Sequence, residues 1–177
     1  NSDSGEHLNS NITSGIQSHH SALKYQHSVI DGQGLLWWRL SYIGHELRPR
    51  LLEFQYSHDI TIQYISILNS PTYHIYFHDC SVVHVDSCQI YVDSYIERVD
   101  GRDSVMYPLN TDGIDIMAVD VIITNNNITS YDDAIVMKPC KRTGIECICA
   151  GNALITNNSV FYSTGLTIGS VPPNLEH

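Results

Sequence analysis

The sequence ITNNNITSYDDAIVMK (residues 123–138) has a related copy further along the chain, ITNNSVFYSTGLTIGS (155–170). The opening Ile-Thr-Asn-Asn is identical in the two copies, and Ile128 aligns with Val160 without a gap. Each copy contains an Asn pair, Asn125-Asn126 or Asn157-Asn158, and Asn tolerates the left-handed backbone that tight turns require. The repeat therefore predicts one β-turn-β unit that occurs at least twice in the chain.

A looser version of this cycle aligns Ile60-Thr61-Ile62 with Val82-Val83-His84. Periods of roughly 20–50 residues are typical of solenoids and propellers. Short strands, no predicted helix and a coil-like period favour an all-β parallel β-helix over a sandwich or a propeller. The runs predicted as strands are residues 59–67, 73–77, 81–85, 88–92, 120–124, 127–131, 134–138, 152–156, 160–163 and 166–171.

The composition indicates one globular domain, with 177 residues, 42% hydrophobic residues and 16% charged residues. The net charge of −10 argues against a nucleic-acid partner, because phosphate backbones need clustered Lys and Arg. No apolar run approaches the roughly 18 residues of a membrane span. We interpret residues 1–27 as a polar leader and residues 28–177 as part of a single β-helix domain whose later coils are missing.

Five cysteines leave at least one thiol free or paired outside this chain. A disulfide between Cys80 and Cys88 and its absence are equally compatible with the sequence. The His and Cys residues of YHIYFHDCSVVHVDSC (73–88) lack the closely spaced cysteine pairs of zinc sites, so no metal is predicted.

Carboxylates recur at the spacing of one coil. Asp112 precedes the pair Asp132-Asp133 by roughly 20 residues, which is within the range of a solenoid repeat. In a solenoid with that period, residues one coil apart stack on the same face, with rungs near 4.8 Å. We therefore expect these three side chains to converge, with Asp115 close behind them.

Two interpretations of these carboxylates compete. Any single Asp can cap a turn through its own side chain. Three clustered carboxylates repel one another, however, and clustering raises the pKa of at least one of them. The result is a general acid beside ionised bases, the arrangement that glycoside hydrolysis needs. Inverting enzymes place the two carboxyl groups roughly 6.5–9.5 Å apart, which diagonal neighbours on adjacent rungs would supply.

Several motifs resemble glycoside hydrolase family 28, the polygalacturonase family. The resemblance covers roughly residues 28–172 and implies a right-handed parallel β-helix that hydrolyses α-1,4-galacturonosyl linkages in pectin with inversion, without metal or cofactor. The similar segments are NTDGIDI (110–116), DDAIVMK (132–138), VIDGQGLLWW (29–38), RPRLLEF (48–54), ILNSPTYHIYFHDC (67–80) and STGLTIGSV (163–171).

The resemblance also implies roles for individual residues. By position in the motifs, Asp132 is the expected general acid, and Asp112 and Asp133 are expected to hold and activate the water. Asp115 and Lys138 match motif positions near the groove and are expected to bind substrate.

Three departures from the family pattern concern the substrate. Thr164, also an expected substrate contact, stands where the family usually has His, and Tyr131 replaces a usual Gly and would crowd the groove. The family's Arg-Ile-Lys motif does not occur after these coils. An exo-acting rhamnogalacturonan or xylogalacturonan hydrolase and a non-catalytic carbohydrate-binding β-helix therefore remain alternatives. A calcium-dependent pectate lyase is disfavoured, because no arginine is expected near the three carboxylates.

The expected partner is pectic galacturonan, with no nucleic acid and no membrane, and the expected state is a monomer. Three Asn-x-Ser/Thr sequons, at Asn11, Asn127 and Asn157, weakly favour secretion to the extracellular space or cell wall. We expect little or no activity from these 177 residues on their own.

Overall fold

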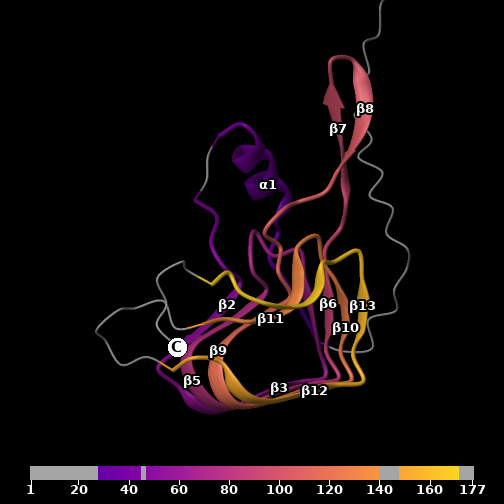
Figure 1. Cartoon of the computed structure of the whole chain (residues 1–177). Coiled ribbons are helices and arrows are strands. Elements are labelled where there is room, and N and C mark those ends of the chain that lie inside the picture. The colour runs from indigo at the N-terminus through magenta and orange to yellow at the C-terminus, as the bar shows by residue number, and fades with distance from the viewer. Residues whose placement is uncertain (1–27, 45–46, 140–147, 172–177) are drawn as a thin grey trace, which may run out of the picture.

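The computed structural model describes residues 28–44, 47–139 and 148–171. The interpreted leader, residues 1–27, lies outside the described residues. From Ser28 onward the chain winds through two parallel sheets as a solenoid (Figure 1). The described coils therefore form a parallel β-helix, as the repeat predicts.

The two sheets differ in strand length. The sheet of short strands runs, in spatial order, through β1 (Ser28–Asp31), β4 (Ile65–Leu68), β6 (Gln89–Tyr91), β10 (Asn127–Thr129) and β13 (Ser159–Phe161). The second sheet runs through β14 (Gly165–Ile168), β11 (Asp133–Met137), β9 (Ile114–Thr124), β5 (Ile75–Asp86) and β2 (Leu52–Gln55), with β12 (Gly151–Thr156) on β9 and β3 (His58–Gln63) on β5.

The register of the coils tests the predicted alignments. Ile128 on β10 pairs with Val160 on β13, which confirms the alignment of the two copies of the repeat. The looser alignment is wrong by one position, because Ile60 pairs with Val83 rather than Val82. Val82 has a left-handed backbone, with φ at 53°, and its side chain is exposed. Asp59, opposite Val82 in the preceding coil, is also left-handed, with φ at 57°, so both coils bend one residue before the inward-facing Ile60 and Val83.

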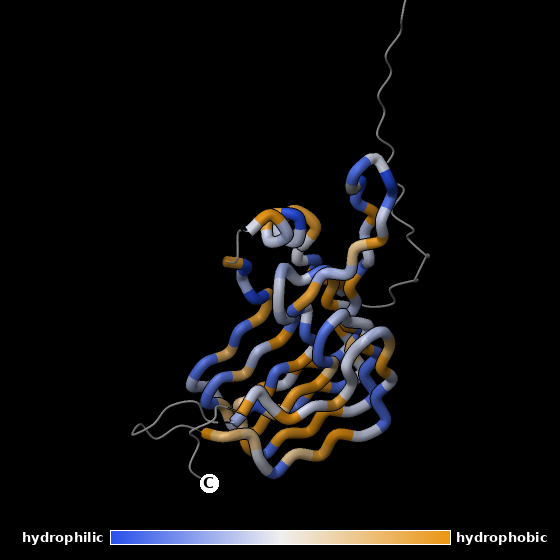
Figure 2. The backbone as a smooth tube through the Cα atoms, turned by 45° about the horizontal axis from the view of Figure 1, so that its top comes forward, coloured by the Kyte–Doolittle hydropathy of each residue, from blue (hydrophilic) through white to orange (hydrophobic). Residues whose placement is uncertain are grey.

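The core lies inside the coils. Alternate residues of the long strands point inward, and Ile75, Phe77, Ile114, Ile116 and Ile135 are buried. Figure 2 shows the resulting alternation of apolar and polar positions along neighbouring strands. The outward-facing residues between these positions are therefore available to form a site.

Tight turns join the long strands to the next short strands. Each turn has one residue with a left-handed backbone at the equivalent position of its coil, with φ between 52° and 57°. These residues are Tyr64, Ser87, Asn125 and Asn157. The two Asn pairs of the repeat thus lie in turns, as predicted. Asn126, next to Asn125, is buried and links three coils.

Asn126→Ala is expected to lower the free energy of unfolding by about 2–4 kcal/mol, because its side chain accepts from Cys88 N–H at 2.9 Å and donates to Val85 O at 3.1 Å and Asn158 Oδ1 at 2.9 Å. Urea denaturation followed by circular dichroism measures the change. Exposed Asn127→Ala is the matched control and is expected to stay within about 0.5 kcal/mol. Equal losses of stability in the two variants would contradict a structural role for the hydrogen bonds of the Asn126 side chain.

Two elements were not predicted. The expectation of no helix is wrong, because α1 (Leu35–Tyr42) follows β1, and its Trp38 is buried and donates Nε1–H to Ser70 O at 3.0 Å. β7 (Tyr95–Val99) and β8 (Arg102–Met106) form an antiparallel hairpin. Both elements project from the same side of the coil stack (Figure 1). No described helix has the length and apolar character needed to cross a bilayer.

The open question of a disulfide between Cys80 and Cys88 is answered by the structure. Both thiols are buried and free. Cys80 Sγ donates to Phe54 O at 3.4 Å, and Cys88 Sγ donates to Ile62 O at 3.6 Å. The two residues therefore lie in the core of one coil, each against the preceding coil, and are not bonded to each other.

Candidate active site

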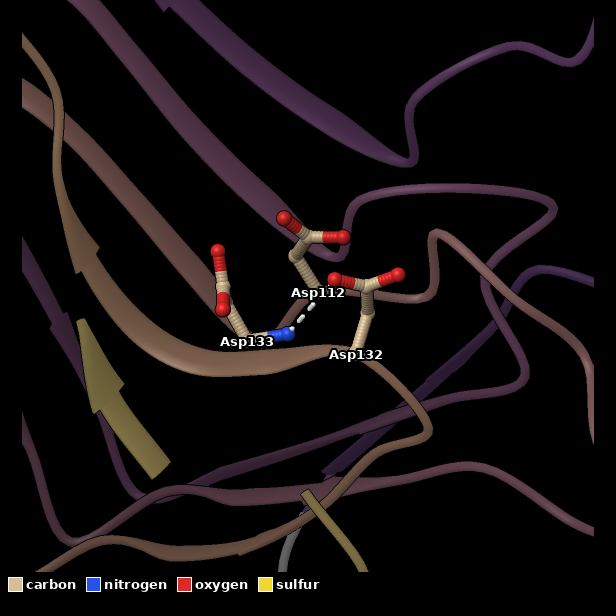
Figure 3. Close-up of side chains that lie close together, drawn as sticks. All are labelled: Asp112, Asp132 and Asp133. Carbon is tan, nitrogen blue, oxygen red and sulfur yellow. Dashed lines mark hydrogen bonds between the residues drawn. The ribbon is translucent and has the colours of Figure 1, made fainter. Parts of the chain in front are cut away.

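Asp112, Asp132 and Asp133 come together where two adjacent coils enter the sheet of long strands. Asp112 precedes β9, and the other two lie at the start of β11. Each offers one carboxylate oxygen within 4.8 Å of the others. Figure 3 shows the three carboxyl groups on the same side of the backbone, with the Asp133 N–H donating to Asp132 Oδ1 at 3.0 Å. The convergence predicted from their one-coil spacing is confirmed.

A backbone hydrogen bond fixes the spacing between the two coils that carry these carboxylates. Gly113 N–H donates to Asp133 O at 2.9 Å, which joins the two coils directly behind the carboxylates. A Cβ at Gly113 would lie 2.4 Å from Ala134 O, so only Gly allows this close approach. The family motif Asp-Gly thus has a steric reason in this fold.

Asp112 is the buried member of the cluster, with 3% of its surface exposed. Burial, followed by the charges of Asp115 and Asp132, raises the pKa of Asp112 to about 8. Lys138 opposes this shift. The expectation that clustering raises at least one carboxyl pKa therefore agrees with the structure, and the affected residue is Asp112.

Asp115 and Lys138 form a charged pair behind the cluster. Lys138 Nζ lies 2.9 Å from Asp115 Oδ1 and 3.9 Å from Asp112 Oδ2. Burial raises the pKa of Asp115 to about 6 against the opposing effect of Lys138. Both carboxylate oxygens of Asp115 are buried, so this side chain lies behind the half-exposed Asp132 and Asp133.

Thr164 reaches the cluster from the next coil. Its Oγ1 donates to Asp133 Oδ1 at 2.6 Å, and its backbone N–H donates to Asp132 O at 3.0 Å. The residue that replaces the family's usual His therefore contacts the Asp pair itself.

Tyr131 lies between two other tyrosines. Its ring centroid is 5.0 Å from that of Tyr107, at the end of the hairpin, and 6.2 Å from that of Tyr162, in the next coil. The side chain is half-buried. Tyr131 thus belongs to an aromatic row beside the Asp pair.

His74 is a positioning residue that the sequence analysis missed. Ser70 N–H donates to His74 Nε2 at 3.3 Å, so Nδ1 carries the proton and donates to Asp112 O at 2.9 Å. Burial lowers the pKa of His74 to about 4, which keeps the ring neutral. No local motif marks His74, because it precedes Asp112 by 38 residues and meets it only through coil stacking.

The expectation that no arginine lies near the carboxylates is wrong. Arg48 donates to Leu109 O at 2.8 Å and to Asn110 Oδ1 at 3.3 Å. Asn110 N–H in turn donates to Asp132 Oδ2 at 3.0 Å. Arg48 also lines a cavity of about 410 Å³ together with Pro49, Arg50, Glu53, Thr72 and Tyr73.

The cluster offers two kinds of chemistry. Asp112, Asp132 and Asp133 are the described acidic, His or Cys side chains whose donor atoms lie close enough to hold a metal ion. A buried carboxyl with a raised pKa next to two half-exposed carboxyl groups equally fits proton transfer to and from a substrate.

Known proteins are similar to this chain in sequence and in fold. A polygalacturonase of Cryptomeria japonica is 34% identical over 116 residues, which cover 60% of this chain and 20% of that protein. An endo-polygalacturonase of Pectobacterium carotovorum subsp. carotovorum is 28% identical over 160 residues, which cover 82% of this chain and 36% of that protein. The chain thus spans between a fifth and about a third of the length of these relatives.

Two solved structures are similar to the described coils. The polygalacturonase from Erwinia carotovora ssp. carotovora matches with a TM-score of 0.56 and 26% identity over 80% of this chain and 37% of that one. The endo-xylogalacturonan hydrolase from Aspergillus tubingensis matches with a TM-score of 0.67 and 23% identity over 82% of this chain and 35% of that one, which supports the fold alone. Residues 7–174 match the sequence pattern of Glycosyl hydrolases family 28. The chain therefore belongs to glycosyl hydrolase family 28 and has that family's right-handed parallel β-helix fold.

Proposed function

We propose that the protein containing this chain hydrolyses α-1,4-galacturonosyl linkages in pectin. The observation that carries this proposal is the convergence of Asp112, Asp132 and Asp133 within 4.8 Å at the junction of two coils. The similarity to polygalacturonases supports galacturonan as the substrate. We further propose a secreted, monomeric enzyme that acts outside the cell or in the cell wall.

The three carboxyl groups differ in solvent exposure, and we assign their roles in the reaction from this difference. Burial and neighbouring charges raise the pKa of Asp112 to about 8, so Asp112 brings a proton into the cluster near neutral pH. Asp132 is half-exposed and next to that proton, so it is the member placed to protonate the leaving glycosidic oxygen. As that proton passes through Asp132 to the leaving oxygen, Asp112 and Asp133 orient the attacking water and take up the proton that the water loses.

Inversion at the anomeric carbon is part of the proposal. The nearest oxygens of the cluster lie within 4.8 Å, closer than the roughly 6.5–9.5 Å expected from the sequence and common in inverting enzymes. Inversion is therefore proposed from the resemblance to glycoside hydrolase family 28 and not from this separation. Proton NMR of the first products identifies their anomeric form. A β-anomer from the α-linked substrate supports inversion, and an initial α-anomer would show retention.

The test of the function uses the protein as its gene encodes it. Polygalacturonate, rhamnogalacturonan and xylogalacturonan are incubated separately, and new reducing ends are measured with the sizes of the products. Reducing ends from polygalacturonate support the proposal, and monomer or mixed oligomers distinguish exo from endo action. Release only from a branched substrate would favour the alternative hydrolases, for which the contact of Thr164 with Asp133 is the supporting observation.

A pectate lyase is the second candidate, because Arg48 lies near the cluster. Arg48 donates to three oxygen acceptors, of Pro71, Leu109 and Asn110, and this commits its guanidinium to holding the turn before Asp112. We therefore expect activity without added calcium to stay within about twofold after chelator treatment. Unsaturated products that absorb in the ultraviolet, together with loss of activity in chelator, would establish the lyase instead.

A further inference from the structure

Cationic side chains gather on one side of the carboxylate cluster. Six of the nine Lys and Arg residues lie in the described ranges. Three of these six surround Tyr73: Arg50 Cζ is 5.4 Å and Lys138 Nζ is 5.5 Å from the ring centroid, and Arg48 lines the same cavity as Tyr73. In a protein of net charge −10, two cations, Arg48 and Arg50, thus line one cavity together with the acidic Glu53, and Lys138 lies beside the Tyr73 ring.

The cavity lies on the same face as the cluster. Strand pairing places Glu53 beside Tyr76, and Tyr76 beside Asp115, so these outward-facing positions form one column across three coils. Neighbouring rungs are about 4.8 Å apart. The cavity floor therefore begins one to two rungs, roughly 5–10 Å, from the carboxylates, within reach of an adjoining sugar unit.

Of these three cations, Arg50 is the one with the most N–H groups left to donate to a ligand. Its guanidinium stacks 4.2 Å from the centroid of Tyr76, and its Nη1 donates to Glu53 Oε1 at 2.9 Å. Its side chain is 37% exposed. Lys138 is engaged with Asp115, and Arg48 with three oxygen acceptors, whereas Arg50 has Glu53 as its hydrogen-bond acceptor among the described residues.

We propose that this cavity is a subsite for the carboxylate of an anionic sugar unit next to the bond that is hydrolysed, with Arg50 as the residue that binds it. The inference rests on the proposed function, which supplies a polyuronide substrate. A guanidinium fixed on an aromatic face presents a planar fork that matches a carboxylate. Glu53 repels a carboxylate on its own side, so the ligand meets the opposite edge of the fork.

Binding is measured by calorimetry in the Asp132→Asn background, where turnover does not interfere. The probes are a homogeneous galacturonate oligosaccharide and its fully methyl-esterified form. Arg50→Gln is expected to weaken binding of the acid form about 10- to 100-fold and that of the ester by less than about twofold. Arg50→Lys keeps the charge but not the fork and should give an intermediate loss. Arg98→Gln, on the hairpin surface, is the matched control and should change neither affinity.

The outcomes separate this inference from the proposed function. Hydrolysis of polygalacturonate by the wild type with unchanged binding in Arg50→Gln would overturn the subsite and leave the function standing. Selective loss of acid-form binding in Arg50→Gln supports the subsite even if no substrate is cleaved. Equal losses for acid and ester would also overturn it, because they would indicate a loss of shape and not of carboxylate recognition. Circular dichroism of each variant confirms that the fold is retained.

Discussion

Asp132→Asn is expected to lower kcat on polygalacturonate about 10²- to 10⁴-fold and to change KM little. Asn keeps the size of the side chain but has one carbonyl oxygen, so it can accept from only one of the N–H groups of Asn110 and Asp133, which Asp132 meets with separate oxygens. The backbone bond from Thr164 N–H to Asp132 O is unaffected, so the turn should survive. What is lost is the proton that the leaving oxygen requires. A loss of kcat with unchanged affinity indicates an interaction made only in the transition state.

The matched control for this variant is Asp103→Asn, which removes an exposed carboxylate on the hairpin, 67% exposed at the side chain. Its kcat should stay within about twofold of wild type. If Asp132→Asn retained full activity, Asp132 would not be the acid. Asp112→Asn would then be the next variant to examine, since Asp112 has the raised pKa.

The pH dependence has a definite direction. Burial and neighbouring charges raise the pKa of Asp112 to about 8 and that of Asp115 to about 6, so the cluster holds a proton below these values and loses it above them. The reaction gives that proton to the leaving oxygen and recovers one from the attacking water, so it needs the protonated form. We therefore expect kcat/KM to fall as the pH rises through about 6 to 8. A profile that rises over this range would contradict an acid held in the cluster.

The parts of this site that could be predicted are those linked by short sequence spacing. Asp112 and the Asp pair are about one coil apart in the sequence, and one turn of the solenoid brings their side chains together. Asn125 and Asn157 likewise mark their turns because their residue type has a local backbone preference. Local chemistry and a regular period suffice for these features.

Other parts depend on long insertions, which change the period from coil to coil. His74 lies 38 residues before Asp112, because the hairpin interrupts that coil, and no fixed period connects them. Arg48 reaches Asn110 across 62 residues. The hairpin could have been predicted from the sequence, because Asp100-Gly101 lies between two runs in which apolar and polar residues alternate. In the structure both residues have positive φ, as a two-residue hairpin turn requires.

The second large effect is expected on stability. Lys138→Met should lower the free energy of unfolding by about 3–5 kcal/mol at neutral pH, because it leaves the buried, ionised carboxylate of Asp115 without its cation. Met fills similar space, so the loss is electrostatic and not a cavity effect. Arg102→Met removes an exposed cation from the hairpin and should stay within about 0.5 kcal/mol.

The pH dependence of this loss follows from linkage. Carboxyl groups whose pKa is raised in the fold bind more protons in the native than in the unfolded state, so stability falls as the pH rises through the raised values. Removing Lys138 raises the pKa of both groups further. The penalty should therefore grow as the pH rises through about 6 to 8 and should shrink below about pH 6, where both carboxyl groups are protonated in the native state of either protein.

A double variant decides whether the uncompensated charge is the cause. If it is, Asp115→Asn in the Lys138→Met background removes one buried charge and should recover about half of the lost stability, so the two effects are strongly non-additive. Urea denaturation at pH 7 of wild type, both single variants and the double variant completes the cycle. Additive losses would mean that Lys138 stabilises the fold through packing, and the charged pair would then have no part in holding Asp112 in place.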